Sequence, residues 1–481
     1  MEQYILAELN PRHVFRFFEE LSRIPRGSGD NRAASDWCVR FAQERGLRCR
    51  QDEALNVIIW KDASPGYEDH PAVILQGHLD MVCVQDSGVN HDFTKDPLDL
   101  YVDGDFLRAR GTTLGGDNGI AVAMALAVLD DSTLAHPPIE AVFTTDEEIG
   151  LLGANALDCS DLQGRILLNL DSEEEGILTV SCAGGARCDI SRSFPAASTS
   201  GVLCTLTVSG LQGGHSGVEI HLGRANANKV LAACLQELPG ALRLVSVFGG
   251  LQDNAIPKES TASFLLCEQD VEAAKAAAAA LCQRFAQQFA AVEPSLSIEL
   301  EVGAAAVCEA LSAEDSAMFL RLLNEYPNGV QTMSEDIEGL VQTSLNLGVL
   351  RLENGCCQLS SAIRSSVDAE KAALSRRLAD LAAAYGAAFG QRGDYPGWQY
   401  RKESPLRETM IRVYRQLYGK EPVIEAIHAG LECGIFAGKL DGLDAVSIGP
   451  DLAEVHSTRE RLSISSTERF WEYLVQVLAQ L

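Results

Sequence analysis

The first 190 residues contain short apolar runs that stop abruptly at polar residues, and this pattern strongly limits the possible folds. Segments with helical periodicity separate the runs, so buried strands are expected to alternate with helices. We therefore predict an α/β domain with a doubly wound sheet, in which strand ends deliver polar side chains to one edge. The runs and the polar residues that follow them are 72–75 with His78 and Asp80, 139–144 with Glu147 and Glu148, and 165–170 with Asp171.

Acidic residues gather at these strand ends without basic neighbours in the sequence. His78 and Asp80 stand two residues apart, so on a strand their side chains share a face and the carboxylate can orient the imidazole. Asp117 lies in a glycine-rich turn at 115–119, ahead of an alanine-rich helix. Each acid alone is also typical of a helix cap or a turn. Several acids brought together repel one another unless cations are present, so with a histidine they predict a divalent-metal site.

The pattern changes near residue 186, where a second type of module begins. Its expected elements follow the β-α-β-β-α-β order of a ferredoxin-like unit, and similar elements from 313 to 389 indicate a duplicated module. The polar segment 390–402 is expected to return the chain to the first domain. We thus predict an α/β domain formed by 1–186 and 395–481, with a ferredoxin-like α+β domain inserted at 187–394.

Composition excludes some partners. The 481-residue chain has a net charge of −28, which would be repelled by a phosphate backbone or an anionic membrane, so neither nucleic acid nor a membrane is expected to bind. Residues 1–4 do not begin a signal peptide, and no apolar stretch is long enough to span a bilayer. The 14 cysteines include no C-x-x-C spacing. These features predict a cytoplasmic protein with reduced thiols.

Several motifs, in this order and wording, resemble the di-zinc metallopeptidases that include carboxypeptidase G, the bacterial tripeptidase and the carnosinases. The resemblance extends over nearly the whole chain, and the motifs are specific in combination. The matching stretches are 77–83 (GHLDMVC), 111–120 (GTTLGGDNGI), 144–151 (TTDEEIGL), 169–175 (NLDSEEE), 213–217 (GGHSG), 428–434 (HAGLECG) and the late His456.

The resemblance implies two zinc ions held by five residues. Asp117 would bridge both metals, His78 and Asp171 would complete one site, and Glu148 and His456 would complete the other. Three carboxylates and a bridging hydroxide would offset most of the charge of two divalent cations. Histidine with carboxylates suits zinc, with cobalt or manganese as substitutes.

The same resemblance assigns two residues to catalysis and one backbone feature to the site. Glu147 would be the general base that activates the metal-bridging water and passes its proton to the leaving amine. Asp80 would orient His78. A cis peptide is expected between Asp117 and Asn118.

Four further residues receive roles only through the resemblance. His215, between glycines, would reach the metal site of a neighbouring module or of a partner subunit and stabilise the oxyanion of the tetrahedral intermediate, although such a histidine is also typical of an ordinary loop. Asn254 and Arg364 match positions that bind the carboxylate or carbonyl end of the substrate, and an arginine suits a free carboxylate. Glu432 matches a turn that contacts substrate in the wider family, where an aspartate is more usual.

Together these features predict a dipeptidase that hydrolyses unblocked dipeptides and prefers Xaa-His, including carnosine. A related di-zinc amidohydrolase, such as a tripeptide aminopeptidase or an N-acyl amino acid deacylase, is the neighbouring alternative. A non-enzymatic metal-binding protein of the same fold is a third, which the intact base and ligands disfavour. The resemblance also implies that the inserted domain is a lid or dimerisation domain and that the protein is a homodimer.

Overall fold

The computed structural model describes residues 4–481, which divide into two compact units. The first contains the chain up to Ser181, together with Tyr400–Ala426 and Leu431–Leu481; the second contains Cys182–Gln399 and Ile427–Gly430. The predicted boundaries lie at 186/187 and 394/395, close to the observed changes. The short segment Ile427–Gly430 has no counterpart in that prediction. Residues 1–3, part of the segment judged not to begin a signal peptide, lie outside the described range.

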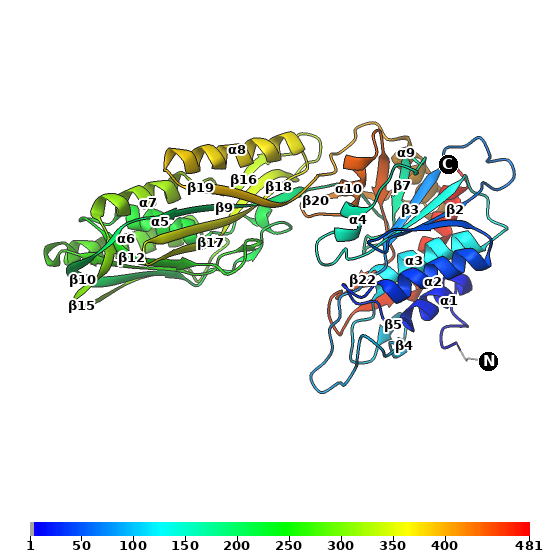
Figure 1. Ribbon diagram of the computed structural model, residues 1–481, viewed down its shortest axis with the longest axis horizontal. Coiled ribbons are helices and arrows are strands. Elements are labelled where there is room, and N and C mark those ends of the chain that lie inside the picture. Colours follow the sequence, from blue (N-terminus) through cyan, green and yellow to red (C-terminus); the bar gives the residue numbers. More distant parts are fainter. Residues whose placement is uncertain (1–3) are drawn as a thin grey trace. The chain divides into compact units, whose positions relative to one another are not determined.

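An eight-stranded mixed sheet forms the centre of the first unit (Figure 1). Parallel pairing joins β3 to β6 and to β7, and β7 to β21, whereas β2 runs antiparallel to β6. All residues of β3 and β6 are buried, as expected where a sheet is covered on both faces. In order across the sheet, the strands are β1 (Arg48–Gln51), β2 (Val57–Lys61), β6 (Ile139–Thr144), β3 (Val73–His78), β7 (Ile166–Asn169), β21 (Asp444–Ser447), β8 (Ile177–Cys182) and β20 (Val423–Ile427).

Helix α3 (Gly116–Asp130) is the central helix of this unit. Every residue from Asn118 to Leu129 is buried, because α3 packs along β3 on one side and against α1 on another. The remaining elements of the unit are α1 (Arg12–Ser22), α2 (Arg32–Glu44), α4 (Leu152–Ala156), α9 (Pro405–Tyr418), α10 (Glu432–Lys439), α11 (Ile464–Leu478) and a small sheet of β22 (Leu452–Ala453), β23 (Arg461–Ser463), β5 (Phe106–Ala109) and β4 (Leu100–Asp103). Across the described residues, no helix combines the length and apolarity needed to cross a membrane.

The second unit is built on one nine-stranded antiparallel sheet, so the prediction of an α/β chain with a separate α+β module is confirmed. The strands, in order, are β15 (Ser297–Leu311), β10 (Ala196–Ser209), β14 (Ser260–Leu266), β12 (Arg243–Gly249), β17 (Val341–Glu353), β18 (Cys356–Ser365), β9 (Gly184–Ser193) and β19 (Ala388–Tyr395), with β16 (Gly329–Met333) also on β17. A separate pair joins β11 (Gly214–His215) to β13 (Ala255–Ile256).

This sheet contains the ferredoxin-like strand arrangement twice. The first copy runs β10-α5-β12-β14-α6-β15 and the second runs β9-α7-β17-β18-α8-β19. In each copy the fourth strand lies beside the first strand, and the third strand lies beside the second. Along the chain, the whole first copy is inserted after β9, the first strand of the second copy. The copies meet where Val247–Gly249 of β12 pair with Leu350–Leu352 of β17.

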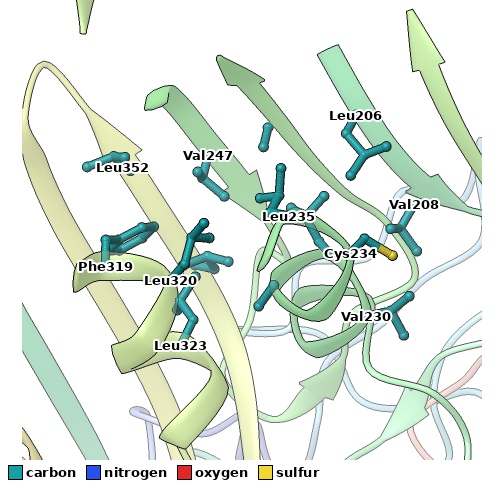
Figure 2. Close-up of a cluster of buried hydrophobic side chains, with 14 of the residues drawn as sticks. Leu206, Val208, Val230, Cys234, Leu235, Val247, Phe319, Leu320, Leu323 and Leu352 are labelled. Carbon is teal, nitrogen blue, oxygen red and sulfur yellow. The ribbon is translucent and has the colours of Figure 1, made fainter. Parts of the chain in front are cut away.

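Helices α5 (Ala227–Glu237), α6 (Val271–Gln288), α7 (Ala313–Glu325) and α8 (Asp368–Ala384) pack against the strands of this sheet. Figure 2 shows the apolar faces of α5 and α7 meeting the strands, with Leu235 and Phe319 directed toward Val247 and Leu352. Burial of these side chains from both copies gives the unit one continuous core.

The predicted return crossing at 390–402 is wrong in its first part. Ala388–Tyr395 form β19, an edge strand that pairs with β9, and α8 ends at Ala384. Most residues of β19 are exposed, so the strand lacks the apolar alternation that marks a buried element.

Candidate metal centre

Three neighbouring parallel strands of the first unit end at the same edge and carry the predicted site residues there. β3 ends at His78, which is paired in register with Thr144 at the end of β6. On the other side of β3, Gln76 pairs with Asn169, the last residue of β7. Glu147 and Glu148 therefore follow one strand, and Asp171 follows another, at the carboxyl edge where ligands bind in α/β sheets.

Asp117 lies between two histidines. Its Oδ1 is 3.1 Å from His78 Nε2, and its Oδ2 is 3.2 Å from His456 Nε2. His456 Nε2 also lies 3.0 Å from the Glu148 carboxylate, and His78 Nε2 lies 3.6 Å from Asp171 Oδ1. The structure thus brings together all five predicted metal ligands, from segments far apart in the sequence.

The electrostatics of the site follow from these short distances. Burial alone would lower the pKa of His78, but the charge of Asp171 and the contact with Asp117 raise it well above its usual value. Hydrogen bonds to Asp117 and Glu148 raise the pKa of His456 to about 10. Burial and the neighbouring acids raise the pKa of Asp171 to about 6. Without a cation, protons on the histidines therefore offset the repulsion between carboxylates.

The donor set fits a divalent cation. Ligand atoms of His78, Asp117 and Glu148 all lie within 4.8 Å of one another, which places two carboxylates and an imidazole in reach of one ion. Imidazole nitrogen with carboxylate oxygen is a donor set typical of zinc and its first-row neighbours.

Asp80 connects His78 to the turn that carries Glu147. Its side chain is fully buried, and its Oδ1 lies 3.4 Å from His78 Nδ1, while its main-chain oxygen is 3.1 Å from the same nitrogen. The Asp80 carboxylate also accepts hydrogen bonds from the backbone N–H groups of Glu147 (3.1 Å) and Glu148 (3.4 Å). One side chain therefore orients a predicted ligand and the predicted base, as histidine-bound carboxylates commonly do.

Glu147 is half-buried beside other acids. Burial raises its pKa to about 9, with further contributions from the charges of Asp171, Glu432 and Glu148. Without a cation, Glu147 therefore favours its protonated form, and bound cations would lower its pKa and free the carboxylate to act as a base.

The predicted cis peptide between Asp117 and Asn118 is present. The side chain of Asn118 accepts a hydrogen bond from His78 N (3.1 Å) and donates one to Leu170 O (3.0 Å). The residue after Asp117 thereby links the ends of β3 and β7. Gly77 is required here, because a Cβ at that position would lie 2.5 Å from Asn118 Oδ1.

The structure places the other predicted residues as follows. Glu432 lies in the first unit, fully buried, and its Oε2 accepts hydrogen bonds from Gln76 (2.5 Å) and Thr144 (2.8 Å). His215, Asn254 and Arg364 lie in the second unit. His215 pairs with Ala255, next to Asn254, in the β11–β13 ladder. The roles assigned to these four residues remain predictions.

The hydrogen bonds of His215 and Arg364 bear on their predicted roles in oxyanion and carboxylate binding. His215 Nδ1 accepts hydrogen bonds from the N–H groups of Gly217 and Val218 (3.3 Å each), so in the neutral ring Nε2 carries the proton. Burial and the charge of Arg364 lower the pKa of His215. Arg364 donates to Tyr395 Oη (3.2 Å), and its Nε is buried without a hydrogen-bond partner among the described residues.

Two charged residues that the sequence analysis did not single out also contact this centre. Arg26 and Glu460 are both almost fully buried, and both form hydrogen bonds to the backbone near Asp117. Arg26 lies in a polar loop and Glu460 in a charged segment, so neither position shows an apolar pattern that would signal burial.

Comparison with known proteins identifies the class. Residues 74–480 match peptidase family M20/M25/M40, and the chain belongs to this family. It is 38% identical to the cytosol non-specific dipeptidase of Escherichia coli (strain K12) over 482 residues, 99% of each chain. The predicted resemblance to metallopeptidases is therefore confirmed.

Solved structures agree with this assignment. The aminoacylhistidine dipeptidase of Vibrio alginolyticus superposes with a TM-score of 0.94 at 37% identity, covering 99% of this chain and 98% of that one. A tripeptidase from Staphylococcus aureus shares the fold at 15% identity, with a TM-score of 0.55 and 98% coverage of both chains.

Cation binding to this centre should release protons. Because the pKa values of His78 and His456 are raised in the cation-free protein, both rings carry protons at pH 7 and must lose them to bind a metal. The apparent affinity for Zn²⁺ or Co²⁺ should rise with pH, with about two protons released per chain. Calorimetric titrations in two buffers of different ionisation enthalpy measure this release; equal heats in both buffers would contradict it.

Proposed function

We propose that this protein is a di-zinc dipeptidase that cleaves unblocked dipeptides, with a preference for Xaa-His peptides that include carnosine. The proposal rests on the position of Asp117, whose two carboxylate oxygens each face a histidine. Glu147 lies next to Glu148 at the same edge of the sheet. The family membership and the two relatives, each of them a dipeptidase, support the substrate class.

His78, Asp117, Glu148, Asp171 and His456 would hold two Zn²⁺ ions, with Co²⁺ or Mn²⁺ as substitutes. Asp117 offers one oxygen to each side and so suits a bridging position. Bound there, the cations would lower the pKa of a water molecule and polarise the carbonyl of the scissile peptide bond.

The side chains of the protein supply the proton transfers and the binding. Glu147 would take the proton from the attacking water and deliver it to the leaving amine. His215, neutral and with a proton on Nε2, would donate a hydrogen bond to the oxyanion. Asp80 would hold His78 and the turn that carries Glu147 in fixed positions relative to each other, through the contacts described above.

Substrate binding is assigned to Arg364, Asn254 and Glu432. Arg364 is the best supported, because its buried, unpartnered Nε suits the free carboxylate of a dipeptide. A free carboxylate is the group that distinguishes a dipeptide from the same bond inside a longer chain.

We also propose that the protein works in the cytoplasm as a homodimer formed through the second unit. All 14 cysteines are free, which suits a reducing compartment. The second unit has exposed outer strands, and the edge strand β15 carries Val307 with 71% of its surface exposed.

Replacing Glu147 with Gln should lower kcat on dipeptides by about 10²–10⁴-fold, because the amide cannot accept the proton from water. Metal content should stay unchanged. The assay uses the metal-loaded protein on a panel of Xaa-His dipeptides, tripeptides and N-acetylated amino acids, with the exposed Glu53→Gln as the charge-matched control. Full activity of Glu147→Gln would refute the mechanism. Preference for tripeptides or acylated amino acids would instead favour the neighbouring amidohydrolases.

Replacing Arg364 with Met should lower kcat/KM for a dipeptide by about 10–100-fold, which is the loss expected when one hydrogen bond to a charged group is removed. For the same dipeptide as its C-terminal amide, which lacks the carboxylate, the effect should be small. Arg377→Met, at an exposed position of α8, serves as control. An equal loss on acid and amide would show that Arg364 does not bind the carboxylate.

Sedimentation velocity over a range of concentrations should show a dimer, and Val307→Lys should weaken it. The matched control is Val423→Lys in the first unit, where the side chain is 53% exposed. A wild-type protein that stays monomeric at all concentrations would exclude the homodimer.

A further inference from the structure

Two buried side chains that bear opposite charges when ionised, Arg26 and Glu460, flank the turn that carries Asp117. Their exposed fractions are 1% and 3%. Burying a charge without compensation is costly, so such groups persist only when hydrogen bonds satisfy them. Both residues direct these bonds to main-chain atoms of the segments that carry the predicted metal ligands.

Glu460 accepts hydrogen bonds from four consecutive backbone N–H groups. Its Oε2 binds the N–H groups of Leu114 (2.8 Å) and Gly115 (3.0 Å), and its Oε1 binds those of Gly116 (2.8 Å) and Asp117 (3.3 Å). These donors lead into the N-terminus of α3, where a negative charge is favourable. Glu460 also lies four residues after His456, so one side chain ties the Asp117 turn to the His456 segment.

Arg26 ties the same turn to the end of β3. Its Nη1 donates to the main-chain oxygens of Leu79 (2.9 Å) and Asp80 (3.1 Å), and its Nη2 donates to that of Gly115 (2.5 Å). The planar guanidinium reaches both segments with one rigid group, which a lysine cannot do. The two segments joined in this way carry His78 and Asp117.

Arg26 and Glu460 both lie close to glycines of the 115–119 motif. Gly115 has a φ of +64°, and a Cβ there would collide with Arg26 Nη2. A Cβ at Gly119 would lie 2.6 Å from the same nitrogen, and one at Gly116 would lie 2.6 Å from Leu452 Cδ2 and 3.2 Å from Glu460 Oε1. The glycine-rich motif therefore provides the space in which the buried charges reach the backbone.

We infer that Arg26 and Glu460 are positioning residues, which hold the segments bearing His78, Asp117 and His456 at cation-binding spacing before a cation arrives. The inference rests on the proposed metal centre. Neither residue contacts the predicted ligand atoms, so their effect is transmitted through the backbone, and it reduces the reorganisation that binding requires.

The test is the affinity of Glu460→Gln for Co²⁺, measured by calorimetry and by visible absorption of the bound ion. The amide is isosteric, but its NH₂ group faces two backbone N–H donors. Affinity should fall by about 10–100-fold, as for other residues that support metal ligands. Arg26→Lys keeps the positive charge but lacks the planar guanidinium that reaches both segments. It should show the same loss of affinity and provides a second variant if Glu460→Gln does not fold.

Glu293→Gln is the matched control. Glu293 is 1% exposed and accepts hydrogen bonds from the backbone N–H groups of Gln212 (2.7 Å) and Ala225 (3.0 Å), but it lies in the second unit. This variant should lose thermal stability and keep its Co²⁺ affinity. If Glu460→Gln and Arg26→Lys fold and bind Co²⁺ as tightly as the wild type, the residues are merely structural and the inference is wrong. If the wild type itself binds no Co²⁺, the proposed metal centre fails instead.

Discussion

Repulsion between carboxylates at one edge of a sheet is the constraint on which the first unit depends. Asp117, Glu148 and Asp171 lie near one another and beside two histidines, and Glu147 adds a further acid. Such an arrangement is stable only with protons or cations present. The surrounding structure holds it in place through many hydrogen bonds to the backbone, of which those from Asp80 and Asn118 join separate strand ends.

The second unit depends on a different constraint, the covering of exposed strand edges. Each ferredoxin-like copy has two edge strands, and the pairing of β12 with β17 covers one edge of each copy. The helices of both copies then share one core with the sheet, as Figure 2 shows for α5 and α7. The tandem arrangement thus gives a single chain a broad sheet, and β12 and β17 need no second chain to cover them.

The sequence predicted what depends on local pattern and missed what depends on distant contacts. Apolar runs ending in His78, Glu147 and Asp171 identified the strands, because buried parallel strands read as continuous apolar segments. The edge strand β19 was missed since its exposed residues are polar. Arg26 and Glu460 were missed because the backbone partners of Arg26 are 53 to 89 residues away and those of Glu460 are 343 to 346 residues away, and no periodicity records such contacts.

The joining of two copies in one polypeptide has an evolutionary consequence. In a symmetric pair of identical chains, every substitution appears twice, and each copy must serve every role. Here His215 comes from the first copy and Arg364 from the second, and a Cβ on Gly217 would touch both side chains. Because the copies are encoded separately, each can accumulate its own substitutions. A histidine in one copy and an arginine in the other can therefore be kept without compromise between the two.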